Sequence, residues 1–147
     1  MKKLLFVLLL CPLMVMTSCR DSSGSNNKAK ELLLANDIKA ANDQFPMQVD
    51  YATTALSVAL EGDYVVYSFE INESVVDLAD LDQESFKNQL KNNFVSAYKT
   101  QPDYHMSMSL VKETEKSLRY KYKGSLSGKT IAIDFSNAEL HEMFGDE

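Results

Sequence analysis

Two runs of alternating apolar and polar residues, joined by a Gly-Asp pair, constrain the fold more than any other feature of this sequence. Residues 53–61 and 64–71 flank Gly62-Asp63. Alternation puts every second side chain on one face of a strand, and a Gly-Asp pair between two such runs is typical of a tight β-hairpin turn. The sequence therefore predicts a hairpin with one inward face. The side chains expected on that face are Leu56, Val58 and Leu60 in the first strand and Val65, Tyr67, Phe69 and Ile71 in the second.

Three later segments show the same alternation and predict three further strands, at 104–112, 117–125 and 129–135. The connections between them are short, which favours an antiparallel meander over a parallel sheet. The side chains expected to face inward are Met106, Met108 and Leu110, then Leu118, Tyr120 and Tyr122, and finally Ile131, Ile133 and Phe135.

Helical spacing of apolar residues predicts helices at 28–45, 82–99 and 137–144. The first should end before Pro46, because proline disfavours helical geometry in the residue that precedes it. The stripe expected on the second helix includes Phe86, Leu90 and Phe94. The residues expected to cap these helices are Asn27, then Asp80 or Asp82, and finally Ser136 with Glu139 as a capping box.

The predicted order of elements is α-β-β-α-β-β-β-α. Each strand has one apolar and one mostly polar face, so the helices should cover a single face of the sheet. The expected fold class is α+β, with an antiparallel sheet of about five strands and helices packed on one face. Residues 28–147 would form this single domain, which is long enough to bury a core without metals or disulfides.

The first nineteen residues have the organisation of an export signal. Two lysines precede the apolar run at 4–10, and small residues precede Cys19. A membrane-spanning helix needs about 20 apolar residues, and here Pro12 interrupts a shorter run. We therefore expect residues 1–18 to be removed as a signal peptide, which leaves 129 of the 147 residues in the mature chain.

A cysteine directly after the cleavage position makes this segment resemble a bacterial lipoprotein signal. Cys19 would then be the first mature residue and would carry the acyl chains, palmitate among them, that anchor the protein in a membrane. The other cysteine, Cys11, lies inside the signal, so the folded domain would be held by its core alone. The alternative is an ordinary cleavage site that leaves a free thiol at Cys19.

Residues 19–27 are mostly small and polar, and we expect them to be a flexible tether. The whole chain resembles the small lipoproteins of Bacteroidota. The resemblance rests on the signal, on this tether and on the link NDQFPMQVD at 42–50 between the first helix and the first strand. It implies an exported protein of the cell envelope, lipid-anchored at the outer membrane on its periplasmic or its surface face. It implies no particular activity.

Charge limits the partners of the mature chain. Loss of the two lysines in the signal leaves 13 basic and 21 acidic residues, a net charge of −8. This balance argues against binding to nucleic acid or to anionic lipid. One local exception is the stripe Arg119, Lys121 and Lys123, which alternation places on the open face of the sheet. We predict this stripe as a face that binds an envelope protein or a glycan; the alternative is a solvated strand face.

Few residues are available for catalysis or metal binding. The mature chain has no Gly-x-Ser-x-Gly elbow and only two histidines, His105 and His141. The sequence His105-Met106-Ser107-Met108 contains groups that suit Cu(I), but in a strand His105 would point away from both methionines. The sequence therefore predicts no catalytic residue, no metal site and no cofactor.

These observations predict a non-enzymatic, membrane-anchored envelope lipoprotein that acts as a binding or structural module. Two other classes remain open. One is a small exported hydrolase that uses a histidine or carboxylate base, which a pocket with His105 or His141 beside a carboxylate would favour. The other is an inhibitor or immunity-type domain that blocks an enzyme through a loop or sheet face.

Overall fold

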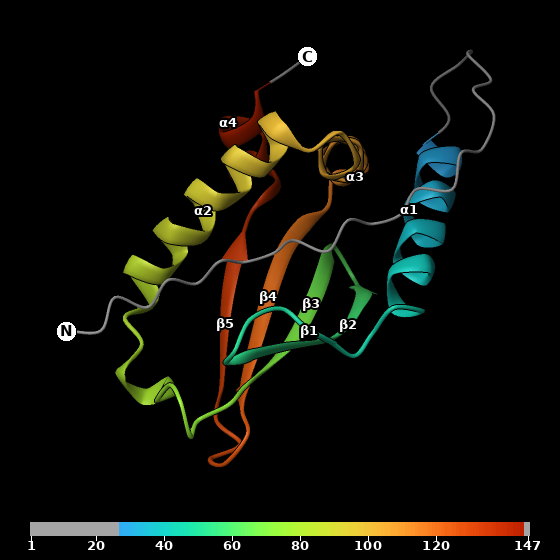
Figure 1. Ribbon diagram of the computed structural model, residues 1–147. Coiled ribbons are helices and arrows are strands. Elements are labelled where there is room, and N and C mark those ends of the chain that lie inside the picture. Colours follow the sequence, from blue (N-terminus) through green and yellow to red (C-terminus); the bar gives the residue numbers. More distant parts are fainter. Residues whose placement is uncertain (1–26, 146–147) are drawn as a thin grey trace.

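The computed structural model describes residues 27–145, in which one five-stranded sheet packs against helices (Figure 1). The predicted signal and most of the predicted tether lie outside the described residues. In chain order the elements are α1 (Asn27–Asn42), β1 (Met47–Gln48), β2 (Thr53–Glu61), β3 (Tyr64–Ile71), the 3₁₀ helix η1 (Leu78–Asp80), α2 (Gln83–Thr100), α3 (Pro102–Glu113), β4 (Ser117–Gly124), β5 (Thr130–Phe135) and α4 (Asn137–Phe144).

The α+β class and the number of strands are confirmed, but the sheet is mixed. Its strand order follows the chain from β1 to β5, and three of the four pairings are antiparallel. The central strands β3 and β4 are parallel. The reason is their connection, which carries η1, α2 and α3 back along the sheet, whereas an antiparallel pairing needs only a turn.

The predicted strand at 104–112 is wrong, because this segment is helix α3. Its apparent alternation is a coincidence of composition. The buried residues Tyr104, Met108 and Val111 recur at helical spacing, and Met106, which was predicted to face inward, is 46% exposed. Pro102 stands in the first turn of α3. Proline is favoured there because the N–H groups of the first turn have no acceptor within the helix, so the N–H that proline lacks costs no hydrogen bond.

The predicted hairpin is confirmed, with β2 and β3 joined at Gly62-Asp63. The inward face of β2 differs from the prediction. A register shift between Ala55 and Ser57 exchanges the faces within the strand, so that Ala55 is buried and Leu56 is exposed. Leu60 is also exposed, at the end of the strand.

Asn42 fixes the last turn of α1 against the edge of β2. Its side-chain amide donates to the Val58 carbonyl at 2.6 Å and accepts from the Val58 N–H at 3.0 Å. The two bonds have the pattern that a neighbouring strand would supply. They therefore satisfy backbone groups of an edge strand at a point that the short strand β1 does not reach.

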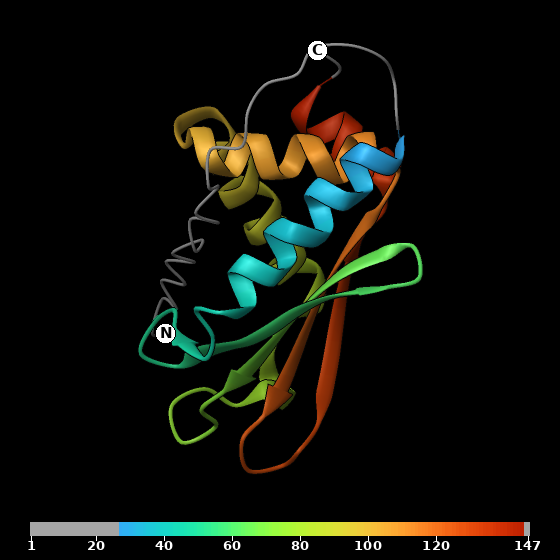
Figure 2. The same cartoon turned by 90° about the vertical axis from the view of Figure 1, so that its right-hand side faces the viewer.

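All four α-helices contribute to a single core on one face of the sheet (Figure 2). The core is rich in aromatic rings. Phe94 of α2 is fully buried, and its ring lies 5.1 Å from that of Tyr120 and 5.3 Å from that of Phe135. The predicted stripe of α2 is thus confirmed, as are the inward residues of β4 and β5.

The predicted helix starts are also confirmed in two cases. The Asp82 carboxylate accepts from the backbone N–H groups of Glu84 and Ser85, which caps α2. Ser136 and Glu139 form the predicted capping box of α4. Among residues 27–145, no helix is long and apolar enough to cross a membrane.

Candidate binding surfaces

The stripe predicted from β4 lies on the sheet face opposite the core. Leu118, Tyr120 and Tyr122 are buried. The residues that alternate with them, Arg119, Lys121 and Lys123, are half-buried or exposed. Beside them on the same face lie residues of β3 and β5, because the register pairs Lys121 with Ser68 on one side and with Ala132 on the other. We call this surface, formed by the outward side chains of β3, β4 and β5, the open face.

Arg119 is held within this face by Asp134 of the adjacent strand β5. Its Nε donates to Oδ1 at 2.7 Å and its Nη2 donates to Oδ2 at 2.6 Å, a bidentate pair. The guanidinium also lies over the Tyr64 ring, 4.1 Å from its centre. The hydrogen bonds from Arg119 lower the pKa of Asp134 and raise that of Arg119. The Arg119 guanidinium therefore interacts mainly with residues of its own sheet.

The other two cations of the stripe differ from Arg119. Lys121 Nζ lies 2.8 Å from the Glu61 carboxylate of β2, and both side chains keep substantial exposure. Lys123 is exposed and lies in register with Glu70. The open face is thus a mixed lattice of cations and carboxylates, whereas the sequence predicted a cationic stripe. Because the net charge of the open face is small, a partner would recognise it by the positions of the individual charges.

Stability should fall in acid partly through the Arg119–Asp134 pair. Since the pKa of Asp134 is lower in the folded chain than in the unfolded one, the stabilisation is present above about pH 4 and is lost as pH falls through the folded value. In Asp134→Asn, the decrease of the urea midpoint between pH 7 and pH 3 should be smaller than in wild type, by about 0.3 M. Asp80→Asn, an exposed change in η1, is the control and should keep the wild-type pH dependence. If the urea midpoint fell by the same amount between pH 7 and pH 3 in Asp134→Asn and in wild type, the Arg119–Asp134 pair would contribute nothing to the pH dependence of stability.

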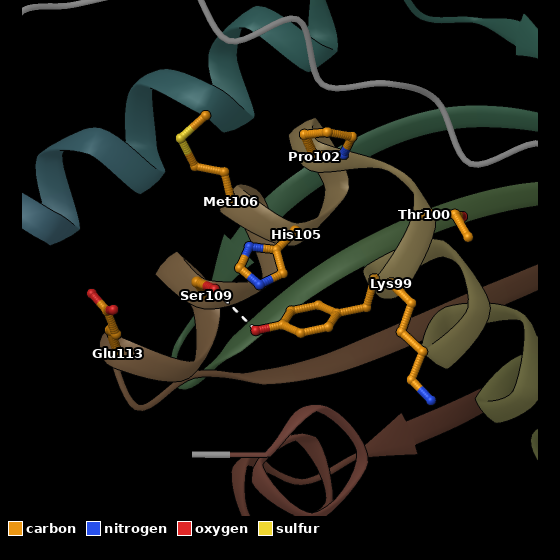
Figure 3. A pocket seen from close by; sticks show the side chains of 8 residues that line it. Lys99, Thr100, Pro102, His105, Met106, Ser109 and Glu113 are labelled. Atoms are coloured by element: carbon orange, nitrogen blue, oxygen red, sulfur yellow. Dashed lines mark hydrogen bonds between the residues drawn. The ribbon is translucent and has the colours of Figure 1, made fainter. Parts of the chain in front are cut away.

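A second surface feature is a pocket of about 720 Å³ where α2 meets α3 (Figure 3). Tyr98 lines it, with its hydroxyl 3.3 Å from the Ser109 Oγ and its ring centre 4.2 Å from that of His105. The remaining lining residues are Lys99, Thr100, Pro102, Met106 and Glu113. The pocket was not predicted from the sequence, because three of its eight lining residues lie in the segment 104–112, which was predicted to be a strand.

The pocket contains a histidine and a carboxylate, the feature that the hydrolase alternative requires. However, His105 and Glu113 are eight residues apart on one helix, which separates them by about 12 Å along the axis. Glu113 is instead paired with Lys30 of α1 at 2.9 Å. It therefore cannot orient the His105 imidazole as a third catalytic group would. His141, the other histidine, lies on α4 and does not line this pocket.

The copper-type cluster also has a different geometry from the one expected of a strand. On helix α3, Met108 is buried in the core and Met106 is exposed, so the two thioethers lie on different sides of the helix. Among residues 27–145, no three His, Cys, Asp or Glu side chains are placed to hold a metal ion together.

The architecture is that of a small α+β domain with four helices on one face of a mixed sheet. No protein-family model matches the chain, and no curated protein matches it. Solved structures that share the fold include a Pseudomonas aeruginosa protein assigned as secreted, with 11% identity and a TM-score of 0.59 over 81% of this chain and 99% of that one.

Two further structures with this fold are pilotins of type II secretion systems. EpsS from Vibrio vulnificus is 14% identical, with a TM-score of 0.54 over 78% of this chain and 94% of its own. AspS from Vibrio cholerae is also 14% identical, with a TM-score of 0.51 over 77% of this chain and 94% of its own. At these identities the likeness establishes a shared fold.

Proposed function

We propose that this chain is an envelope lipoprotein, anchored through acylated Cys19, that works by binding another envelope protein. Anchoring is inferred from the order of charged, apolar and small residues before Cys19. Binding without catalysis is inferred from the described domain, in which His105 and Glu113 share a pocket but stand too far apart to act as a catalytic pair.

The observation that carries the proposal is the open face. Helices cover one side of the sheet, and the other side presents charged side chains at fixed strand spacing. Arg119–Asp134 and Lys121–Glu61 place charges of both signs a few ångströms apart, which suits recognition of a complementary charged protein surface. That two proteins of this fold are pilotins of a secretion system supports a role beside other envelope proteins.

Affinity purification from membranes tests both parts of the proposal. Wild-type protein should fractionate with membranes and carry an acylated Cys19, and Cys19→Ala should move almost entirely to the soluble fraction. Arg119→Glu/Lys121→Glu should lose a partner that wild type retains. Because these reversals place like charges beside Asp134 and Glu61, Lys121→Gln/Lys123→Gln is the matched variant that leaves the Arg119–Asp134 pair intact.

The two parts can fail separately. Membrane retention of Cys19→Ala, or an unmodified Cys19 in the mass spectrum of the N-terminal peptide, would contradict the anchor. Unchanged recovery of every partner by both sets of charge variants would exclude the open face as the binding site. Circular dichroism melting curves of the variants establish that loss of a partner does not come from unfolding.

A further inference from the structure

Three of the most exposed large apolar side chains lie on three loops at one end of the sheet. Tyr51 is 59% exposed in the β1–β2 connection, Val75 is 48% exposed after β3, and Leu126 is 74% exposed between β4 and β5. In both ribbon views the segment after β3 and the β4–β5 turn lie at the lower end of the molecule, and the β1–β2 connection lies above them (Figures 1 and 2). We call residues 49–52, 72–77 and 125–129 the loop end.

Backbone hydrogen bonds join the three loops to one another. The Asn72 N–H donates to the Ala52 carbonyl at 2.8 Å, which ties the segment after β3 to the β1–β2 connection. The Ser125 N–H donates to the Ile71 carbonyl at 2.9 Å, which ties the β4–β5 turn to the end of β3. The three loops that carry the exposed apolar side chains are therefore neighbours.

Glu73 accepts three hydrogen bonds from the β4–β5 turn. Its Oε2 accepts from the backbone N–H groups of Leu126 at 2.8 Å and Ser127 at 2.6 Å, and its Oε1 accepts from the Ser127 hydroxyl at 2.7 Å. These bonds lower the pKa of the Glu73 carboxyl. Gly124 leaves room for this carboxylate, since a Cβ there would lie 2.4 Å from it. Leu126 is thus presented from a fixed turn, and an apolar side chain ordered in advance costs little entropy on binding.

The chain around the loop end is strongly acidic. Residues 40–86 contain ten acidic residues and no lysine, arginine or histidine, although two of the ten, Glu61 and Asp63, lie at the opposite end of β3; Lys129 is the one cation within the loop end. Four of these carboxylates, those of Asp77, Asp80, Asp82 and Glu84, are exposed within eight residues that follow directly on Val75 and Val76. The potential at this side of the loop end is therefore negative, and it favours a cationic partner.

The loop end also lies far from the start of the described chain. Lys30 in the first turns of α1 is paired with Glu113, and the nearby Lys116 lies 3.5 Å from Asp63 in the β2–β3 turn. That turn is at the opposite end of β3, whose eight residues span about 26 Å. Asn27 is eight Cα–Cα steps from Cys19, which reach at most about 28 Å. An anchor at Cys19 therefore joins the domain at the end remote from the three apolar side chains.

We propose that the loop end is a docking surface for a cationic segment of another protein, one that carries apolar side chains among lysines or arginines. The apolar trio supplies the contact area, and the carboxylates at 77–84 supply complementary charge. Exposed apolar side chains grouped on one surface of a small domain are typical of a contact site. The position of the loop end relative to the membrane rests on the proposed anchor at Cys19; its charge and its exposed residues do not.

The same features separate this partner from a lipid bilayer. Anionic headgroups would be repelled by the carboxylates that border the apolar trio. An anchor that joins the domain at the other end also leaves the loop end free to point away from the membrane surface. A protein segment satisfies both conditions.

Site-specific photo-crosslinking of the full-length protein in its membrane tests the proposal. A benzophenone amino acid is introduced at Leu126 or Val75, with Leu32 of α1, which is 62% exposed near the other end, as the matched control position. Adducts from Leu126 and Val75 should exceed those from Leu32 several-fold. Peptide mapping should place them on a protein segment in which lysine or arginine flanks apolar residues.

Charge variants complete the test. Asp80→Lys/Glu84→Lys, which spares the capping carboxylates of Asp77 and Asp82, should reduce the Leu126 adduct several-fold. Glu142→Lys on α4 should leave the yield unchanged. Equal yields at Leu126 and Leu32, adducts with lipid, or mapping to an acidic segment would each overturn the proposal. The cell fraction is read in the same experiment, so a soluble protein that still crosslinks would refute the anchor and leave the docking surface standing.

Discussion

Replacement of Phe94 with alanine should lower the free energy of unfolding by about 3–5 kcal/mol. The Phe94 side chain is fully buried, and its ring contacts Tyr104 from α3, Tyr120 from β4 and Phe135 from β5. The substitution removes the ring and leaves a cavity whose walls belong to three different elements. Such walls cannot all move inward together, so little of the lost packing is recovered. Urea unfolding followed by circular dichroism measures the effect.

Leu32→Ala is the matched control for this prediction. It removes an apolar side chain from an α-helix, but Leu32 is 62% exposed, so the change should stay within about 0.5 kcal/mol of wild type. A loss below about 1 kcal/mol in Phe94→Ala would contradict the central position given to this ring. Phe94→Leu should recover most of the stability, because it refills much of the volume.

Asn42→Ala should cost about 1–3 kcal/mol, the range expected when buried backbone groups lose their partners. The loss exceeds that of an ordinary surface asparagine because one amide serves both the N–H and the C=O of Val58. In Asn42→Asp the acceptor is kept and the donor is lost. Because the new carboxylate oxygen would face the Val58 and Ile38 carbonyls, Asn42→Asp should be at least as destabilising as Asn42→Ala.

Hydrogen exchange adds a local measurement to this experiment. Loss of the Asn42 amide should speed exchange of the Val58 N–H more than that of amides in β4 or β5. Asn92→Ala, at an exposed position of α2, should be neutral or slightly stabilising because alanine is the better helix former. If Asn42→Ala were as stable as Asn92→Ala, the hydrogen bonds from Asn42 to Val58 of β2 would contribute nothing to stability.

The sequence was sufficient for elements whose local signals agree with their burial. The β2–β3 hairpin combines alternation with a turn pair, and α4 combines apolar spacing with a capping box that the structure shows in full. Strands β4 and β5 each bury one face, so their alternation identified the large inward side chains. In these segments the local pattern and the tertiary contacts select the same structure.

Alternation misled where it arose without a buried strand face. In 104–112, serines alternate with methionine and leucine, yet the helix formed by these residues buries Tyr104, Ser107 and Met108. This one substitution of helix for strand also hid the parallel pairing of β3 with β4 and the pocket beside Tyr98. The register shift in β2 had no local signal, because small and apolar residues stand on both faces there.

The candidate surfaces were predicted only in part. Strand spacing placed Arg119, Lys121 and Lys123 on one face, but their carboxylate partners come from β5 and from β2, which are distant in the sequence. The loop end depends on three connections that meet only after the sheet forms. No single segment of the chain contains its pattern.

The parallel pairing of β3 with β4 also sets the order in which the domain can fold. Each paired residue of β3 lies 53 residues from its partner in β4. Pairing the two strands therefore closes a long loop, and the chain loses the entropy of that loop before the contacts between the strands stabilise it. A two-stranded hairpin is at best marginally stable by itself. We therefore expect the β2–β3 hairpin to become stable only when β4 pairs with the free edge of β3. If the chain is exported as proposed, that edge is exposed to chaperones and to aggregation until β4 pairs with it.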